Sequence, residues 1–230
     1  RDEMYGELVA LHAAGVYSED ALWAASRIRG EAMMDHGVDR GTMAAVRGPL
    51  ADIERVLEGL SDGVVLANRN HPTQGVVSGT LGGVARAVVA LRDAGMSARE
   101  ISVSAGFHSA MVEDAAEPFA AGLAALDFAP PAVPVYANAT AAPYPSDPQA
   151  CRDLLTRQIT SPVDFVGLVQ GMVDQGIRTF VECGPKGVVT GLLSKCLEGV
   201  EGARAFALDA RADRVDGDAQ LKRVLASLAA

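Results

Sequence analysis

The segment from about residue 37 to residue 104 constrains the fold most strongly, because its apolar pattern changes period in a fixed order. The expected elements are strands over 42–46, 64–67, 76–78 and 101–104, a turn over 68–73, and helices after Pro49 and after residue 79. Short apolar runs predict the strands, and apolar residues three and four apart predict the helices. The order β-α-β-β-α-β is that of the ferredoxin-like split motif, which can form a compact subdomain.

The sequence on either side of this segment has a different pattern. Residues 1–36 predict two helices, over 5–14 and 19–34, the second capped by Ser18. Residues 105–230 alternate helices with expected strands at 133–136, 179–182 and 205–208. Such alternation indicates a parallel sheet with helices on both faces. We therefore predict an α/β fold, with a parallel-sheet large subdomain formed by 1–36 and 105–230 and the ferredoxin-like small subdomain, 37–104, inserted into it.

Composition excludes several classes of function. Hydrophobic residues make up 49% of the 230, enough for a packed core. No apolar run approaches the roughly 18 residues of a membrane span. The net charge of −9 argues against nucleic-acid binding, since phosphates need cations. The three cysteines are scattered without a CxxC pair, which indicates reduced thiols in a cytosolic protein with neither disulfides nor a zinc site.

Three glycine-rich segments match parts of known functional motifs. Residues 59–63 read G-x-S-x-G, but the order helix, turn, strand is the reverse of a nucleophile elbow, so Ser61 is predicted to lie in the turn that ends a helix. Residues 79–83 and 184–187 each join a strand to a helix, as phosphate loops do. Neither fits a full phosphate-loop pattern, and tight turns are the favoured interpretation.

Two polar residues are candidates for chemistry. His108 follows an expected strand and begins an expected helix, a position at the edge of a parallel sheet where α/β proteins place their active sites. A neutral histidine there is a good general base, although a structural histidine fits the pattern equally well. Arg29 lies within an expected helix, and its spacing alone favours a solvated surface residue.

Six segments in chain order resemble motifs of the malonyl-CoA:acyl-carrier-protein transacylase family, which includes acyltransferase domains of polyketide and polyunsaturated fatty acid synthases. The family motifs are G-H-S-x-G-E, R-G-x-x-M, A-N-x-N-x-P-x-Q, F-H-S-x-M, Q-x-x-x-P-V and E-x-G-P. The matching segments are Tyr5-Gly6-Glu7, Arg29-Gly30 with Met33 and Met34, Ala67-Asn68-x-Asn70-x-Pro72-x-Gln74, Phe107-His108-Ser109-x-Met111, Gln158 with Pro162-Val163, and Glu182-x-Gly184-Pro185. The resemblance covers essentially the whole chain.

The resemblance implies a role for five residues. His108 is the base that activates a serine and later protonates the leaving thiol. The Gln158 position orients that histidine through a carbonyl. Arg29 holds the free carboxylate of a malonyl group, Phe107 narrows the acyl pocket toward malonyl, and Asn70 lies in a small-subdomain loop that faces the substrate. The implied reaction is ping-pong transfer of malonyl from coenzyme A to the phosphopantetheine thiol of an acyl carrier protein, in fatty acid or polyketide biosynthesis.

The resemblance also implies the surroundings of this reaction. The expected partners are malonyl-CoA, an acyl carrier protein and other domains of a synthase, with no nucleic acid and no membrane. The coenzyme A thioester is a substrate, and no cofactor or metal is expected. The expected location is the cytoplasm.

The first residues depart from the family pattern. Aligning Tyr5-Gly6-Glu7 with the first motif places Met4 at the nucleophile position, and the family's preceding strands have no counterpart, so the large subdomain is expected to be incomplete. Two interpretations remain open: part of a working malonyltransferase, inactive as written without its serine, or an inactive module that docks a carrier protein. An α/β-hydrolase esterase is disfavoured, because it requires serine, acid and histidine in that chain order.

Overall fold

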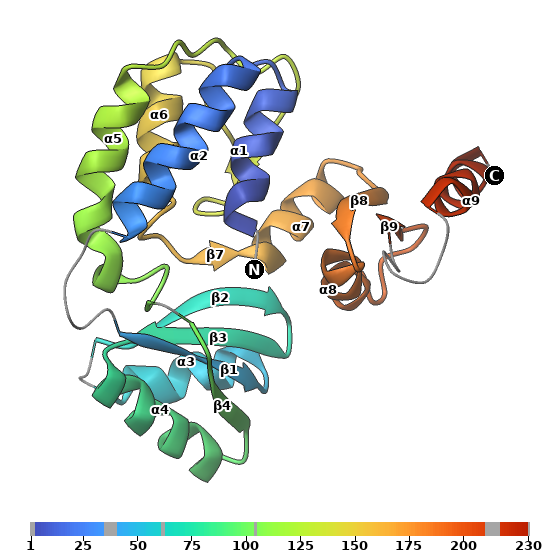
Figure 1. Ribbon diagram of the computed structural model, residues 1–230. Helices are drawn as coiled ribbons and strands as arrows, with labels where there is room; N and C mark the ends of the chain where they lie inside the picture. Colours follow the sequence, from blue (N-terminus) through green and yellow to red (C-terminus); the bar gives the residue numbers. More distant parts are fainter. Residues whose placement is uncertain (1–2, 35–40, 61–62, 104, 210–216, 230) are drawn as a thin grey trace. The chain divides into compact units, whose positions relative to one another are not determined.

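The computed structural model describes residues 3–34, 41–60, 63–103, 105–209 and 217–229, and Figure 1 shows its elements. The chain forms two compact units, Arg1–Leu168 and Val169–Ala230. Among the described residues, no helix is long and apolar enough to cross a membrane. The predicted boundaries at residues 36 and 104 both lie inside the first unit and remain a prediction.

An antiparallel sheet with two helices on one face forms the lower part of the first unit in Figure 1. Its elements are β1 (Thr42–Arg47), α3 (Leu50–Glu58), β2 (Val65–His71), β3 (Gln74–Gly79), α4 (Leu81–Asp93) and β4 (Ser97–Ile101). The strand order is β4-β1-β3-β2, so the predicted ferredoxin-like arrangement is confirmed. Alternate strand residues such as Ala44, Val46 and Val77 pack with Ile53 of α3 and Leu91 of α4 into one core, which leaves the opposite sheet face uncovered by these helices.

A fifth strand comes from far along the chain. β7 (Val163–Asp164) pairs in parallel with β2, with Asn68 opposite Val163 and Arg69 opposite Asp164. A two-residue strand carries no period-two pattern, so the sequence did not indicate it. The pairing fixes the segment after Gln158 against the small sheet.

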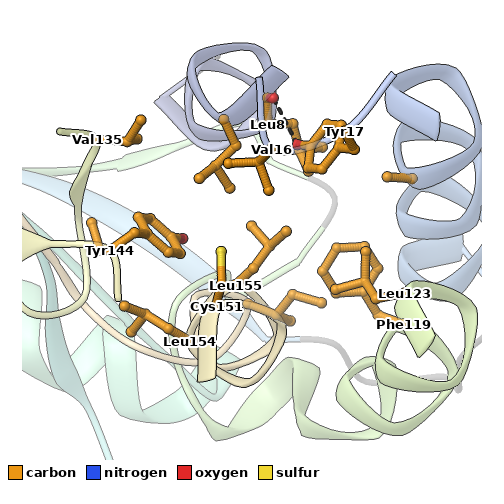
Figure 2. Close-up of a cluster of buried hydrophobic side chains, with 14 of the residues drawn as sticks. Leu8, Val16, Tyr17, Phe119, Leu123, Val135, Tyr144, Cys151, Leu154 and Leu155 are labelled. Carbon is orange, nitrogen blue, oxygen red and sulfur yellow. Dashed lines mark hydrogen bonds between the residues drawn. The ribbon is translucent and has the colours of Figure 1, made fainter. Parts of the chain in front are cut away.

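A helical layer packs beside this sheet. It consists of α1 (Glu3–Ala13), α2 (Glu19–Met34), the 3-10 helix η1 (Ala110–Ala115), α5 (Ala116–Ala124) and α6 (Pro148–Arg157). Figure 2 shows its core, where Leu8 of α1, Phe119 and Leu123 of α5 and Leu155 of α6 converge. Ser18 and Asp147 cap α2 and α6 through hydrogen bonds from the backbone N–H of Ala21 and Ala150, and the cap at Ser18 was predicted from the sequence.

The second unit is a short α/β segment. β8 (Thr179–Pro185) and β9 (Arg204–Asp209) pair in parallel, with α8 (Val188–Cys196) and α9 (Gly217–Ala229) against them. α7 (Phe165–Asp174) spans the division between the units. The predicted parallel pairing of these two strands is confirmed.

Several predicted element positions are wrong. β2 continues to His71 across bulges, so the turn expected over 68–73 contains only residues 72 and 73. Gly95, at a φ of 83°, ends α4 sharply and lets β4 begin at Ser97, which places the fourth strand at 97–101 and not at 101–104. Similarly, β8 extends through Gly184 and Pro185, and the turn expected there falls at residues 186 and 187.

The strand expected at 133–136 is also wrong in position and pairing. The structure has a hairpin of β5 (Tyr136–Ala137) and β6 (Ala142–Pro143), which pair antiparallel. Pro134 removes a backbone donor from within the expected strand, and prolines 130 and 131 lie just before it. Residues 61 and 62 of the G-x-S-x-G segment lie outside the described residues, so its serine is not placed.

Candidate active site

His108 lies in the connection between β4 and η1, at a φ of 57°. The sequence placed it directly after a strand of a parallel sheet. The structure puts it seven residues after Ile101, where β4 ends, and β4 belongs to the antiparallel sheet. The side chain is 4% exposed, and its Nδ1 lies 3.0 Å from the carbonyl oxygen of Ser161, between α6 and β7. Histidine is among the residues that tolerate the left-handed region.

This contact decides the tautomer of His108. A carbonyl oxygen only accepts, so Nδ1 donates its hydrogen and Nε2 keeps the lone pair of the neutral ring. Burial lowers the pKa of His108 to about 4, against backbone hydrogen bonds to Ser161 and Gln158 that raise it, while the charge of Arg29 lowers it further. The ring is therefore neutral at pH 7, with Nε2 able to accept a proton.

Gln158 is buried at the C-terminal cap of α6. The family resemblance predicted that a carbonyl at the Gln158 position orients His108. The carbonyl oxygen of Ser161, three residues later, accepts the 3.0 Å hydrogen bond from His108 Nδ1. A hydrogen bond with the Gln158 backbone also raises the pKa of the ring. The buried Nε2 of Gln158 has no hydrogen-bond partner among the described residues.

Arg29 is buried, not the solvated residue that its spacing favoured. Its side chain on α2 is 2% exposed, and Nε, Nη1 and Nη2 have no hydrogen-bond partner among the residues that the structure describes. The guanidinium carbon lies 5.6 Å from the ring centre of Tyr5. Burial lowers the pKa of Arg29, while Tyr5, Glu7 and Tyr144 raise it. An arginine side chain keeps its charge in proteins. The nearby carboxylate of Glu7 attracts this cation, but no anion among the described residues is hydrogen-bonded to it, and a buried cation without such a partner is costly.

One cavity of about 520 Å³ connects these candidates. Arg29 and His108 both line it, together with the predicted site residues Phe107 and Asn70. The other lining residues are Tyr5, Gly30, Met33, Met43, Asn68, Val76, Ile101, Ser102 and Val103. The structure thus brings four of the five predicted residues to one cavity, and places Gln158 behind His108.

A buried carboxylate near this cavity was not among the predicted site residues. Glu7 of α1 is 4% exposed and accepts hydrogen bonds from the backbone N–H of Asn138 (3.0 Å), its Nδ2 (3.2 Å) and the hydroxyl of Tyr144 (2.9 Å). Burial raises the pKa of Glu7, while these bonds and the charge of Arg29 lower it. The sequence does carry a signal for the burial of Glu7. This acid lies four residues before Leu11, on the apolar side of the predicted helix.

Comparison with known proteins decides the family. Residues 4–228 match the acyl transferase domain family. The chain belongs to this family. It is 40% identical to the polyketide biosynthesis protein ThaF of Burkholderia thailandensis over 208 residues, covering 88% of this chain and 17% of that protein. It is 36% identical to the malonyl CoA-acyl carrier protein transacylase of Bacillus subtilis, covering 83% of this chain and 62% of that enzyme.

Solved structures agree with this assignment. The crystal structure of an acyl carrier protein S-malonyltransferase from Vibrio cholerae superposes with a TM-score of 0.85 at 31% identity, over 95% of this chain and 70% of that one. The acyl transferase domain described here spans less than two thirds of the length of the two relatives above.

Two of the glycine-rich segments of this acyl transferase domain, 79–83 and 184–187, lead into helices that are capped by the protein's own side chains. Thr80 Oγ1 caps α4 by accepting from the N–H of Gly83 at 3.0 Å. At α8, the carboxylate of Glu182 accepts from the N–H groups of Val189 (3.0 Å) and Thr190 (2.7 Å). The protein's own carboxylate therefore occupies the place where an anion would bind. No group of three potential metal ligands is found among the described residues.

Proposed function

We propose that this acyl transferase domain serves malonyl transfer from coenzyme A to the phosphopantetheine thiol of an acyl carrier protein, in fatty acid or polyketide biosynthesis. The supporting observation is the buried guanidinium of Arg29, unpaired among the described residues, in the same cavity as the neutral imidazole of His108. A malonyl thioester carries a carboxylate at one end and a reactive carbonyl near the other, so it complements both groups. An acetyl thioester would leave Arg29 without an anion.

His108 serves as the base in the proposed reaction. Nε2 takes the proton of the family's nucleophile serine, whose motif position is Met4 in this sequence, as the serine oxygen attacks the thioester carbonyl. The carbon–sulfur bond breaks, and His108 returns the proton to the departing coenzyme A sulfur. The phosphopantetheine thiol of the carrier protein then attacks the ester by the reverse sequence. The carbonyls of Ser161 and Gln158 hold the ring in the required tautomer.

The cavity lining provides the proposed selectivity. The planar guanidinium of Arg29 pairs with a carboxylate through two parallel hydrogen bonds, which favours dicarboxylic acyl groups. Phe107 reduces the space beside the acyl group, and Asn70 offers polar contacts from β2. The reaction draws on no cofactor. We place the domain in the cytoplasm, with malonyl-CoA, a carrier protein and other synthase domains as partners.

Met4 supports a second candidate. It stands where the family motif has the nucleophile serine, and a thioether has no proton for His108 to remove. A domain with this residue would hold malonyl-CoA or dock a carrier protein without forming an ester. Both proposed functions use the same cavity, and only the first includes transfer of the malonyl group.

Binding measurements test the proposed cavity. We expect calorimetry to give tighter binding of malonyl-CoA than of acetyl-CoA, and Arg29→Ala to weaken malonyl-CoA binding by about 10- to 100-fold while leaving acetyl-CoA unchanged. Arg27→Ala is the matched control, because Arg27 is exposed on the same helix and, within the described part of the chain, pairs only with Glu31. Equal losses for the two thioesters in Arg29→Ala would contradict the proposal.

A further inference from the structure

The face of the small sheet that lines part of the cavity extends beyond it. Strand side chains alternate between faces, and Ala44, Val46 and Ala98 pack with the helices. The residues between them therefore point to the opposite face of the sheet. Figure 1 shows α3 and α4 together on one side of this sheet. We call the face away from these helices the pocket face. Its members on β1, β3 and β4 are Met43, Ala45, Arg47, Gln74, Val76, Ser78, Ser97, Arg99 and Ile101.

Two arginines of the pocket face are close together. In the register of β1 with β4, Arg47 is opposite Ser97 and Arg99 is opposite Ala45, so the arginines are diagonal neighbours. Diagonal neighbours on one face lie about 7–8 Å apart, within reach of one another's long side chains. Both are exposed, and neither has a hydrogen bond or ion pair with any described residue. Two like charges so placed attract an anion.

The charge of the pocket face differs from that of the chain. The chain carries 29 acidic and 20 basic residues, yet the described residues of the pocket face include no acid. Glu100 is opposite Ala44 and therefore points to the helix side. Glu54 of α3 pairs with Arg69 on the helix side, and the carboxylate of Asp164 accepts from the backbone N–H of Gly167 at the start of α7. The two arginines are therefore not neutralised by acids of the same face.

Arg47 and Arg99 lie on the same strands and the same sheet face as two residues that line the cavity. Met43 and Ile101 line the cavity, and Arg47 and Arg99 follow on the same face four and two residues along their strands. These steps correspond to about 14 and about 7 Å. The pantetheine arm has about 13 bonds between its sulfur and the first phosphate, equal to roughly 15 Å of extended backbone. The arm of a thioester whose acyl end lies in the cavity is therefore long enough to run from Met43 and Ile101 along this face to the two arginines.

We propose that Arg47 and Arg99 form a binding site for the phosphates of the coenzyme A donor. This inference rests on the proposed function, because it requires the acyl end of the donor to lie in the cavity. The diphosphate and the 3′-phosphate of coenzyme A carry several negative charges, whereas an arm on a carrier protein presents one phosphodiester. Two arginines with no acid on their face complement the more highly charged donor.

Calorimetry with ligands of graded charge tests this site. The ligands are coenzyme A, phosphopantetheine and pantetheine, and the proteins are wild type, Arg47→Gln, Arg99→Gln and the double variant. Arg55→Gln is the control, because Arg55 is exposed on α3 and belongs to the helix side of the sheet. We expect wild type to bind coenzyme A more tightly than pantetheine. The double variant should bind coenzyme A about tenfold more weakly than wild type, and pantetheine with unchanged affinity.

Each outcome decides the inference. A smaller loss at higher salt for coenzyme A would support it, because exposed charges are screened. Unchanged coenzyme A affinity in the double variant, or an equal loss in Arg55→Gln, would overturn it. A loss for phosphopantetheine equal to that for coenzyme A would overturn the assignment to the coenzyme A donor. Malonyl-pantetheine, which has no phosphate, tests the proposed function separately: its affinity should depend on Arg29 and not on Arg47 or Arg99.

Discussion

Glu7 and Asn138, which are 131 positions apart, are joined by two hydrogen bonds in the interior of the first unit. One Glu7 oxygen accepts from the Asn138 backbone, and the other accepts from its side-chain amide. The carbonyl of Asn138 in turn accepts from the N–H of Asp164 in β7, at 3.1 Å. The start of α1 is thereby connected to the segment that carries Ser161, the partner of His108.

Glu7→Ala is predicted to destabilise the first unit by about 3 kcal/mol or more. The substitution leaves three donors of Asn138 and Tyr144 buried without acceptors, and each unmet buried donor costs about 1–3 kcal/mol. Urea unfolding followed by circular dichroism measures the change.

Two milder variants control this prediction. Tyr144→Phe removes a single donor and should cost about 1 kcal/mol, because Glu7 keeps its bonds to Asn138. Glu7→Gln retains one acceptor oxygen and should fall between the two. An alanine variant no less stable than Tyr144→Phe would show that the carboxylate contributes little.

His108 is predicted to make stability fall as the solution becomes acidic. Its pKa is lowered to about 4 in the folded state, while an unfolded histidine titrates near 6.5. The unfolded chain therefore binds more protons between these values, and stability rises with pH in that window. From pH 6.5 down to about 4, wild type should lose about 3 kcal/mol relative to a variant without this group.

His108→Asn supplies that reference, because asparagine also tolerates the left-handed backbone at this position. Urea unfolding of both proteins at a series of pH values gives the difference. A constant difference from pH 7 to pH 4 would show that His108 titrates normally, and would remove the argument for a ring neutralised by burial.

Sequence periodicity predicted the elements that are long enough to show it. α2 was placed at its observed bounds, and the four strands of the small sheet were recognised in the right order, because their apolar residues must face two helices. The exact ends of strands were less predictable. β4 was displaced because a glycine ended the preceding helix early, and β7 is too short for any pattern.

The site was predicted through motifs and not through periodicity. Spacing alone assigned Arg29 to the surface, since a helix pattern does not show which other segment covers it. Its burial arises from parts distant in sequence, including Tyr5 and the small sheet that lines the same cavity. The contact between His108 and Ser161 spans 53 positions and depends on the loop after α6, which no local rule specifies.

The polypeptide with Met4 is predicted to form no malonyl ester when incubated with malonyl-CoA. The thioether of methionine has no hydroxyl or thiol to acylate, so intact-mass measurement should show no stable adduct. Cys183 is an exposed thiol and can exchange with a thioester, so Cys183→Ser is measured in parallel. A stoichiometric adduct that persists in Cys183→Ser would place a nucleophile elsewhere in the chain.

Arg29→Met is predicted to stabilise the ligand-free protein while removing its preference for malonyl-CoA. The guanidinium is buried with no hydrogen-bond partner among the described residues, and replacing such a charge with an apolar side chain of similar length removes a desolvation penalty. We expect a gain of about 1–3 kcal/mol in the free energy of unfolding. Arg27→Met, on the exposed side of the same helix, should change stability by less than about 1 kcal/mol. Saturating malonyl-CoA should stabilise wild type but not Arg29→Met to the same extent, because the carboxylate of the ligand can hydrogen-bond to the guanidinium only where the arginine is present. A loss of stability in ligand-free Arg29→Met would show that the arginine is satisfied without a ligand, and would contradict its proposed role.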